Sequence, residues 1–304
     1  MSKFSEMHSL INQGIKSFLI SGGLLNDGKI PLRYFQDNLY TLKKTYDLKY
    51  NFHTGYIDYE DISYLKKIAD VVSYDLIGDK ETMINVYGHD FFDRSWDTFF
   101  KLLEKDLIVK PHIIIGLNMG QISHEYKVIE RLSILDIKNS NTHKVNELIF
   151  LVFIPTKGTK FCNEQPPSVE EVKSFLAYVK NKLPNNKLTL GCMHPGGNYR
   201  VNLQENLLGI VDKIVQPVNN VVKIAKDMDF NIEYSYECCA FWKKRCCKIV
   251  DFVPSYINQY RTGELHKKRD QLFKKLECCD LCPRECRVNR NKHVGSCRVG
   301  NTIK

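Results

Sequence analysis

The strongest constraint on the fold is a rhythm that repeats seven times between residues 17 and 218. Each repeat is a short apolar run, usually ending at glycine or proline, followed by a stretch long enough for an amphipathic helix. The runs occupy residues 17–23, 49–55, 71–78, 110–117, 147–155, 188–195 and 213–218. Strands that alternate with helices in this way form parallel sheets covered by helices. The sequence therefore predicts an α/β fold of seven consecutive units.

Helix signals fill the intervals between the apolar runs. Pro31 opens one helix, Asp58 and Asp93 can each start another, and Ser168 with Glu171 fits a capping box. Further helices are predicted over residues 4–16, 123–135, 220–228 and 252–276, and a last strand over residues 231–237.

A closed TIM-type (β/α) barrel needs eight such units, one more than this sequence offers. The seven units are contiguous, and the helix predicted at residues 4–16 leads directly into the first of them. We therefore expect residues 1–239 to form a barrel that lacks its first strand unit. A smaller open α/β sheet with an ordinary leading helix is the alternative.

Charge is unevenly distributed along the chain. Residues 240–304 hold 16 basic and 6 acidic residues, whereas residues 1–239 hold 28 and 29. A basic tail of this kind binds nucleic acid, docks on an acidic partner or stays a solvated surface, and we expect one of the latter two. The chain has neither an apolar stretch of about 18 residues nor a signal peptide. We therefore expect a cytoplasmic protein that does not contact membranes.

Nine of the eleven cysteines lie in the last 67 residues. Without a secretory signal, such clustering indicates metal binding rather than a disulfide framework. Cys279, Cys282, Cys286 and Cys297 have the spacing C-x2-C-x3-C-x10-C, which can gather four thiolates around zinc or an iron–sulfur cluster. We predict a basic helical connector over residues 240–277 and a four-cysteine metal-binding module over residues 278–304. The vicinal cysteine pairs 238–239 and 246–247 are weaker candidates for a second metal.

Polar residues follow several predicted strands at the edge where parallel barrels carry their chemistry. His53, His112, Cys192 and His194 are predicted to line a substrate pocket there. Asp75 also lies at a strand end, where it can accept a ribose hydroxyl, bind a cation or cap a turn. A histidine on a strand is often a satisfied core residue instead. A metal-dependent hydrolase using the three histidines and Asp75 is a further alternative.

Two glycine-containing turns at the same edge can approach a ligand closely through their backbones. Gly22 and Gly23 end the first run, and Gly116 lies near the end of the fourth, with Glu125 opening the next helix. The segment from Gly116 to Glu125 can cradle an adenosine-like ligand.

Taken together, these motifs resemble the radical S-adenosylmethionine (SAM) superfamily, in its biotin synthase-like branch. The likeness is greatest to one component of the two-protein archaeal lipoyl synthase. It extends over residues 10–245, and its main elements are residues 19–23, 28–32, 53–55, 75–78, 111–117, 155–159, 190–195 and 238–239.

The resemblance implies roles for individual positions. Gly22 and Gly23 match the motif that meets the amino group of SAM, Asp75 lies near the ribose, and Gly116 through Glu125 lie beside the adenine. His124 departs from the pattern, because the family usually has a small residue there. Members cleave SAM reductively at a [4Fe-4S] cluster, and the resulting radical abstracts a substrate hydrogen. The implied reaction is hydrogen abstraction, with possible sulfur insertion, on a small-molecule or lipoyl-type substrate.

The family holds its cluster with C-x3-C-x2-C after the first strand, and this sequence has no such triplet. The catalytic residues therefore remain unknown, and we expect an N-terminally truncated chain that cleaves no SAM alone. A companion chain is expected to supply the first strand and the cluster loop. The alternative is a non-catalytic metal-binding subunit or a degenerate barrel that docks on a partner.

The segment from Cys279 to Arg298 resembles the leader of a different radical SAM group, similar to glycyl-radical activating enzymes. In that group the leader precedes a complete barrel. The sequence is therefore expected to be part of a longer fusion or of a split gene product.

Overall fold

The computed structural model describes residues 2–138, 145–235, 237–241, 255–282 and 284–301. The chain divides into two compact units, residues 1–242 and 243–304. The boundaries expected at residues 239/240 and 277/278 stay predictions. Within the described residues, every helix is too short or too polar to serve as a membrane span.

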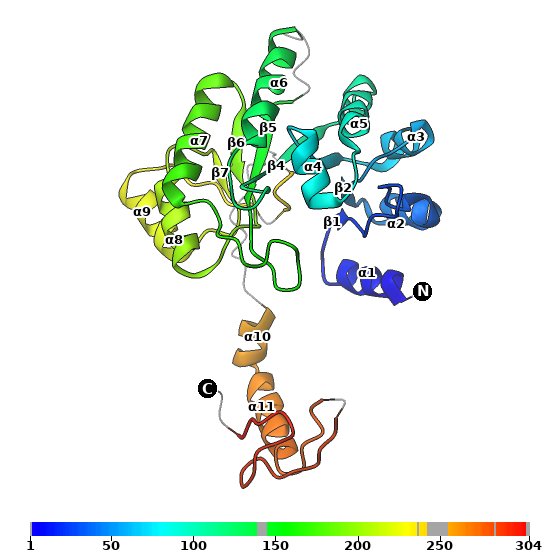
Figure 1. The fold of residues 1–304 in the computed structure, drawn as a ribbon. Helices are drawn as coiled ribbons and strands as arrows, with labels where there is room; N and C mark the ends of the chain where they lie inside the picture. Colours follow the sequence, from blue (N-terminus) through cyan, green and yellow to red (C-terminus); the bar gives the residue numbers. More distant parts are fainter. Residues whose placement is uncertain (1, 139–144, 236, 242–254, 283, 302–304) are drawn as a thin grey trace. The chain divides into compact units, whose positions relative to one another are not determined.

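Seven parallel strands form the centre of the first unit and pair in the order of the sequence (Figure 1). They are β1 (Ser17–Ile20), β2 (Lys49–His53), β3 (Val71–Asp75), β4 (Val109–Ile115), β5 (Glu147–Val152), β6 (Lys187–Leu190) and β7 (Lys213–Ile214). Each lies in a predicted apolar run, although β4 and β6 begin one residue earlier than their runs. Among the described residues, β1 pairs only with β2 and β7 only with β6. The sheet is therefore a partial TIM-type barrel, as the count of seven units predicts.

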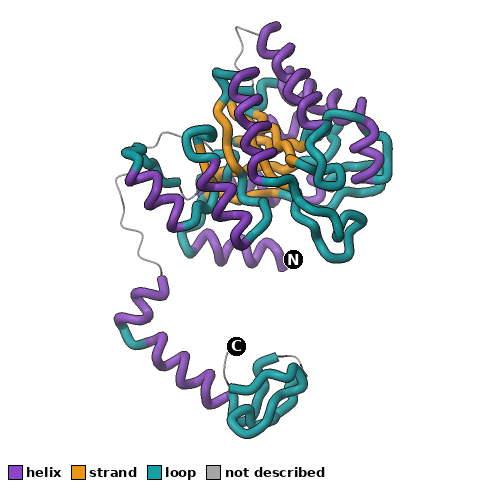
Figure 2. The backbone as a smooth tube through the Cα atoms, turned by 60° about the vertical axis from the view of Figure 1, so that its left-hand side comes forward, coloured by secondary structure: helices purple, strands orange, loops and turns teal. Residues whose placement is uncertain are grey.

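Helices alternate with the strands and cover the outer face of the curled sheet (Figure 2). They are α1 (Ser2–Asn12), the 3-10 turn η1 (Leu32–Phe35), α2 (Gln36–Tyr46), α3 (Tyr59–Ile68), α4 (Lys80–Tyr87), α5 (Phe92–Glu104), α6 (His124–Lys138), α7 (Val169–Lys182), α8 (Gly197–Asn206) and α9 (Asn219–Asp227). Ser168 forms the predicted capping box at α7, and Asp58, predicted only to start a helix, also forms a complete capping box at α3. α5 begins one residue before Asp93 and has no side-chain cap.

The strands place alternate side chains in two environments. On β5, Leu148 and Phe150 face outward and belong to the main core beneath the helices. Ile149 and Leu151 face the inside of the barrel, where they pack against Cys239 and Ala240. The segment around residue 239 therefore crosses the barrel interior, which makes it part of the first unit.

The barrel interior also contains a buried ion pair at the start of two neighbouring strands. Lys110 Nζ on β4 lies 2.8 Å from Glu147 Oε2 on β5, with side chains only 7% and 2% exposed. The other carboxylate oxygen of Glu147 accepts a 2.6 Å hydrogen bond from Thr189 Oγ1 on β6. The pair thus links three strands through polar groups that each have a partner, which offsets the cost of burying the charges.

Two expectations for the later part of the chain need correction. Residues 231–235 form a loop rather than a strand, because only Ile232 among them is even half-buried and no strand pairs with them. The helix expected over residues 252–276 is two helices, α10 (Ser255–Arg261) and α11 (Glu264–Lys275). They are separated at Gly263, whose left-handed φ of 76° ends the first helix. Residues 252–254 lie outside the described part.

Replacing Lys110 by methionine should lower the free energy of unfolding by about 3–5 kcal/mol, because the Glu147 carboxylate stays buried without its cation. Urea denaturation at neutral pH, followed by circular dichroism, measures this loss. The double variant Lys110→Met/Glu147→Leu removes both charges and should recover most of the stability. A double variant as unstable as the single one would show that the two charges are not coupled.

Candidate functional site

Three of the predicted site residues meet inside the barrel, on neighbouring strands. His53 ends β2, Asp75 ends β3, and His112 on β4 lies opposite Asp75 in the strand register. His53 Nε2 lies 3.1 Å from Asp75 Oδ1. The rings of His53 and His112 stack with centroids 5.4 Å apart. The side chains of His53 and Asp75 remain 29% and 33% exposed, so a ligand can reach them.

The two histidines of this group prefer opposite protonation states. Burial lowers the pKa of His53, but the hydrogen bond and the charge of Asp75 outweigh it and raise that pKa overall. Burial raises the pKa of Asp75, but the hydrogen bond to His53 and the charges of His53 and His112 together outweigh burial and lower that pKa overall. His112 is dominated by burial, which lowers its pKa to about 4. At neutral pH the group therefore combines an ionised carboxylate with a neutral imidazole at His112.

Three cysteine sulfurs gather beside His112. Cys239 Sγ lies 3.7 Å from Cys238 Sγ and 3.8 Å from His112 Nε2. The Cys239 thiol also bonds to Cys192, which follows β6. Its hydrogen bonds to Cys192 and Cys238 raise the pKa of Cys239 and lower the pKa values of its two partners. The cluster thus consists of a protonated Cys239 thiol that is hydrogen-bonded to the more acidic thiols of Cys192 and Cys238.

The sequence predicted Cys192 as a pocket residue but placed Cys238 and Cys239 only as a vicinal pair. Asn51 Nδ2 donates a 3.3 Å hydrogen bond to Cys238 Sγ, and Ser73 Oγ donates a 2.9 Å bond to Asn51 Oδ1. Neither Asn51 nor Ser73 was predicted. Asn51 lies two residues before His53 on β2, and Ser73 lies two residues before Asp75 on β3. Alternate residues of a strand face the same side, so this spacing could have identified both. Cys246 and Cys247 lie outside the described residues.

His194 does not join this group. Its Nδ1 lies 3.1 Å from the Gly191 carbonyl oxygen, and its Nε2 lies 3.2 Å from Gln204 Nε2. Both ring nitrogens are therefore used to fasten the loop after β6 to α8. The metal-dependent hydrolase needed His194 to meet His53, His112 and Asp75, so this arrangement does not support it.

The loop after β4 is fixed by Glu125, the completely buried second residue of α6. Glu125 Oε1 accepts a 2.6 Å bond from the Gly116 N–H, and Oε2 accepts a 2.7 Å bond from the Ser123 N–H. Burial raises the pKa of this carboxyl to about 7, despite these backbone bonds. Gly116 has a left-handed φ of 78°, and a side chain there would meet Pro167. The buried Glu125 carboxylate therefore fixes the conformation of the loop from Gly116 to Ser123 by binding the N–H groups at its two ends.

His124 ties that loop to the loop after β3. Its Nδ1 accepts a 3.2 Å hydrogen bond from the Gly78 N–H. A Cβ atom on Gly78 would lie 1.8 Å from the His124 carbonyl oxygen, so only glycine fits there. Burial lowers the pKa of His124 to about 4, which keeps it neutral and able to accept this bond. His124, which is larger than the residue usual in the family, thus joins the loops after β3 and β4 in this chain.

Gly22 and Gly23 lie in the exposed loop after β1, at the same edge as Asp75 and Gly116. A Cβ atom on Gly22 would meet Ile30 at 3.3 Å, whereas Gly23 has open space around it. The loop is held farther along by a 2.9 Å bond from the Tyr56 N–H to the Gly28 carbonyl oxygen. The backbone at Gly23 is therefore accessible to a ligand at this edge.

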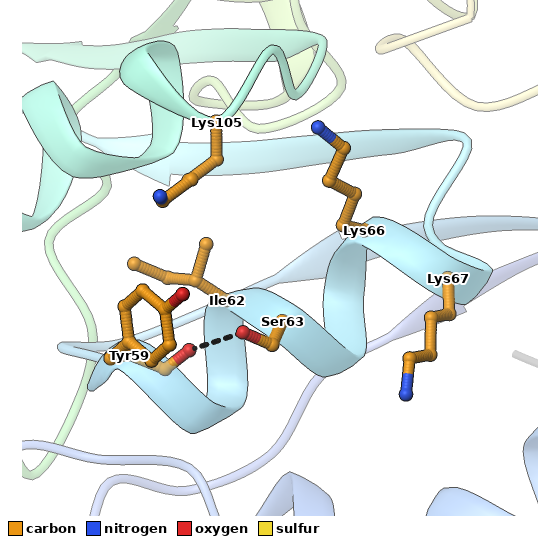
Figure 3. Close-up of a pocket in the computed structure, with 6 residues that line it drawn as sticks. All are labelled: Tyr59, Ile62, Ser63, Lys66, Lys67 and Lys105. Atoms are coloured by element: carbon orange, nitrogen blue, oxygen red, sulfur yellow. Dashed lines mark hydrogen bonds between the residues drawn. The ribbon is translucent and has the colours of Figure 1, made fainter.

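A hollow of about 330 Å³ lies elsewhere, on the outer helical layer (Figure 3). Its lining residues are Tyr59, Ile62, Ser63, Lys66, Lys67 and Lys105. The three lysine side chains point in different directions, and none is among the predicted site residues. The hollow therefore has no connection to the group around Asp75.

The His53–Asp75 pair should make stability depend on pH. The pair stabilises the folded state fully below pH ~6.5, which is the pKa of histidine in the unfolded chain. This stabilisation is lost as the pH rises through the raised pKa of His53. On the acid side, it is lost as the pH falls through the lowered pKa of Asp75. The difference in free energy of unfolding between the wild type and His53→Gln should therefore shrink as the pH rises above ~6.5 and through the raised pKa of His53. The control His89→Gln, at an exposed histidine, should show no such trend; a flat curve for both variants would contradict the pairing.

No family model and no curated protein matches this sequence. The structure is similar to that of the FeFe-hydrogenase maturase HydG from Carboxydothermus hydrogenoformans, with a TM-score of 0.56 and 15% identity, covering 90% of this chain and 68% of that one. A second structure of HydG, a maturase of the [FeFe]-hydrogenase, gives a TM-score of 0.53 and 16% identity, covering 69% of this chain and 48% of that one. Methylornithine synthase (PylB) gives a TM-score of 0.47 and 13% identity, covering 67% of this chain and 64% of that one. The first unit thus has a partial-barrel fold similar to that of the two HydG structures.

Proposed function

We propose that the first unit binds SAM as part of a radical SAM-type enzyme of the biotin and lipoyl synthase-like kind. The observation that carries the proposal is the arrangement at the carboxyl edge of the sheet. There Asp75 lies between the glycine loop after β1 and the glycine loop after β4. A nucleoside with an amino-acid tail needs backbone groups at both ends and a hydrogen-bond acceptor between them.

The residues present suit such a ligand. Asp75 is ionised and uses Oδ1 for His53, so Oδ2 can accept a hydrogen bond from a ribose hydroxyl. Gly23 offers open backbone for the amino-acid end. Gly116 and its loop, held in shape by Glu125, offer backbone for the adenine. In this proposal Glu125 is a positioning residue, because Gly116 and Ser123 already occupy its oxygens.

The [4Fe-4S] cluster of radical SAM enzymes does not fit this chain, because the sequence contains no C-x3-C-x2-C triplet. We therefore assign no step of SAM cleavage to its residues and propose that a companion chain carries the cluster loop. The free edge of β1 supports this proposal. Leu19 on β1 and Leu24 and Leu25 in the following loop are 54%, 47% and 53% exposed, an apolar surface suited to a further strand.

The substrate would lie deeper in the barrel, against His53, His112 and Cys192. A small molecule that carries a lipoyl-type chain is our proposed class of substrate. A non-catalytic subunit remains the second candidate. This candidate is favoured because the polar side-chain atoms of Glu125 and His194 already contact other groups of the protein and are not directed at a ligand.

Equilibrium dialysis of the full chain against radiolabelled SAM tests the proposal. Asp75→Asn should weaken binding by roughly tenfold or more, because a hydrogen bond to a charged acceptor contributes about 1.5–3 kcal/mol. Asp97→Asn, at an exposed residue of α5, is the matched control and should bind like the wild type. Equal affinities for all three proteins, or no binding by the wild type, would contradict the proposed site.

Reconstitution under anaerobic conditions tests the need for a companion. The chain supplied with iron, sulfide, reductant and SAM should form no 5′-deoxyadenosine, because nothing in it matches the cluster motif. Co-expression with a chain that carries C-x3-C-x2-C should restore the product. Formation of 5′-deoxyadenosine by the isolated chain would overturn the companion proposal while leaving the SAM site intact.

A further inference from the structure

The C-terminal unit has almost no apolar core of its own. α11 buries no side chain, and Cys279 is its only buried hydrophobic residue among those described in residues 255–301. Segments this short normally rely on disulfides or a metal for stability. The four cysteines at positions 279, 282, 286 and 297 are free thiols. A different source of cohesion is therefore required.

Two identical turns carry two of these cysteines. The tripeptide Cys-Arg-Val occurs at residues 286–288 and again at residues 297–299. In both, the central arginine is left-handed, with φ of 53° at Arg287 and 60° at Arg298. In both, the N–H of the valine donates to the sulfur of the cysteine two residues earlier. This conformation costs a non-glycine residue about 1–2 kcal/mol, so its repeated use needs a compensating interaction.

The turns direct backbone N–H groups at the sulfurs, and such bonds stabilise thiolates. Backbone pairing brings Cys279 beside the first turn, because the Cys279 N–H donates to the Val288 oxygen at 3.1 Å and the Arg287 N–H donates to the Cys279 oxygen at 2.9 Å. Cys279 therefore lies next to the turn that contains Cys286, although the two cysteines are seven positions apart in the sequence.

A cationic side chain already stands among these sulfurs. Arg290 Nε donates a 2.9 Å hydrogen bond to Cys279 Sγ, and the same guanidinium bonds to Cys297. Cys282 is exposed, and its carbonyl oxygen accepts from the Glu285 N–H at 2.9 Å in a tight turn. Arg290 lies between the sulfurs and Cys282 is exposed, so the described cysteines of this unit do not form a metal-binding group in this conformation.

We propose that Cys279, Cys282, Cys286 and Cys297 bind a single zinc-class ion tetrahedrally, and that the ion takes the place of the Arg290 guanidinium between the sulfurs. A Zn–S distance of about 2.3 Å places the four sulfurs about 3.8 Å apart, which is contact distance. An iron–sulfur cluster holds its cysteines farther apart, since several metal atoms lie between them. The backbone pairing that holds Cys279 against the turn of Cys286 therefore favours one ion. Binding would stabilise the unit directly, because the ligands assemble only when it folds.

Titration of the reduced full chain with cobalt(II), followed by displacement with zinc(II), tests the site. We expect the absorption of tetrahedral thiolate cobalt at one ion per chain, with displacement by one zinc. Cys286→Ser and Cys297→Ser should each weaken binding more than tenfold. Cys278→Ser, an exposed neighbour outside the spacing, is the matched control and should bind like the wild type.

The role of the turns is tested at Arg298, where two substitutions remove the same charge. Arg298→Gly retains the left-handed turn and should bind zinc at least as tightly as the wild type. Arg298→Val resists that conformation and should bind about 5–30 times more weakly. Cobalt absorption unchanged in Cys297→Ser would overturn the proposed site. An iron–sulfur spectrum lost in Cys297→Ser, without any zinc binding by the wild type, would overturn the single-ion assignment.

Discussion

Parallel pairing of seven strands in chain order is the constraint on which the rest of the structure depends. It sends every strand's carboxyl end to one edge of the sheet, so residues far apart in sequence become neighbours without long loops. The pairing of Asp75 with His53, and its register with His112, follow from this order alone. The glycine loops after β1 and β4 reach the same edge for the same reason. A change in strand order would scatter all of these groups.

The second consequence is a barrel interior that is polar over much of its length. Lys110 and Glu147 lie near the amino ends of their strands, and His53 and Asp75 lie at the carboxyl ends. Between them, Cys239 contacts both His112 and neighbouring sulfurs. Because buried polar groups are costly when unpaired, these contacts must form together. The interior is thereby organised before any ligand enters.

Much of the fold was predictable because each strand and helix has a local signal. The seven apolar runs, together with the helix-start signals at Asp58 and Ser168, identified elements that the structure confirms. The prediction of a strand at residues 231–237 was wrong. Alternating apolar and polar residues permit a strand, but they do not show that a neighbouring strand is available for pairing. Apolar runs also overestimated strand length: the seventh covers six residues, and β7 has two.

The candidate site was predictable only in part. Strand ends identified His53 and Asp75, which the structure brings together, but the same reasoning included His194, which Gln204 and Gly191 bind instead. The placement of Cys239 beside His112 depends on a segment that lies many residues after β7 in the sequence but packs inside the barrel, and no local pattern contains that information. In the second unit, the spacing predicts a four-cysteine metal site that stays a prediction, and the left-handed turns at Arg287 and Arg298 appear only in the backbone.

The proposed SAM site occupies one edge of this partial barrel. Hydrogen–deuterium exchange of the full chain with and without saturating SAM tests that site. We expect slower exchange in the loops after β1 and β4 and at the end of β3, with no change in α9. Slower exchange confined to other parts of the first unit, or no change anywhere, would contradict it.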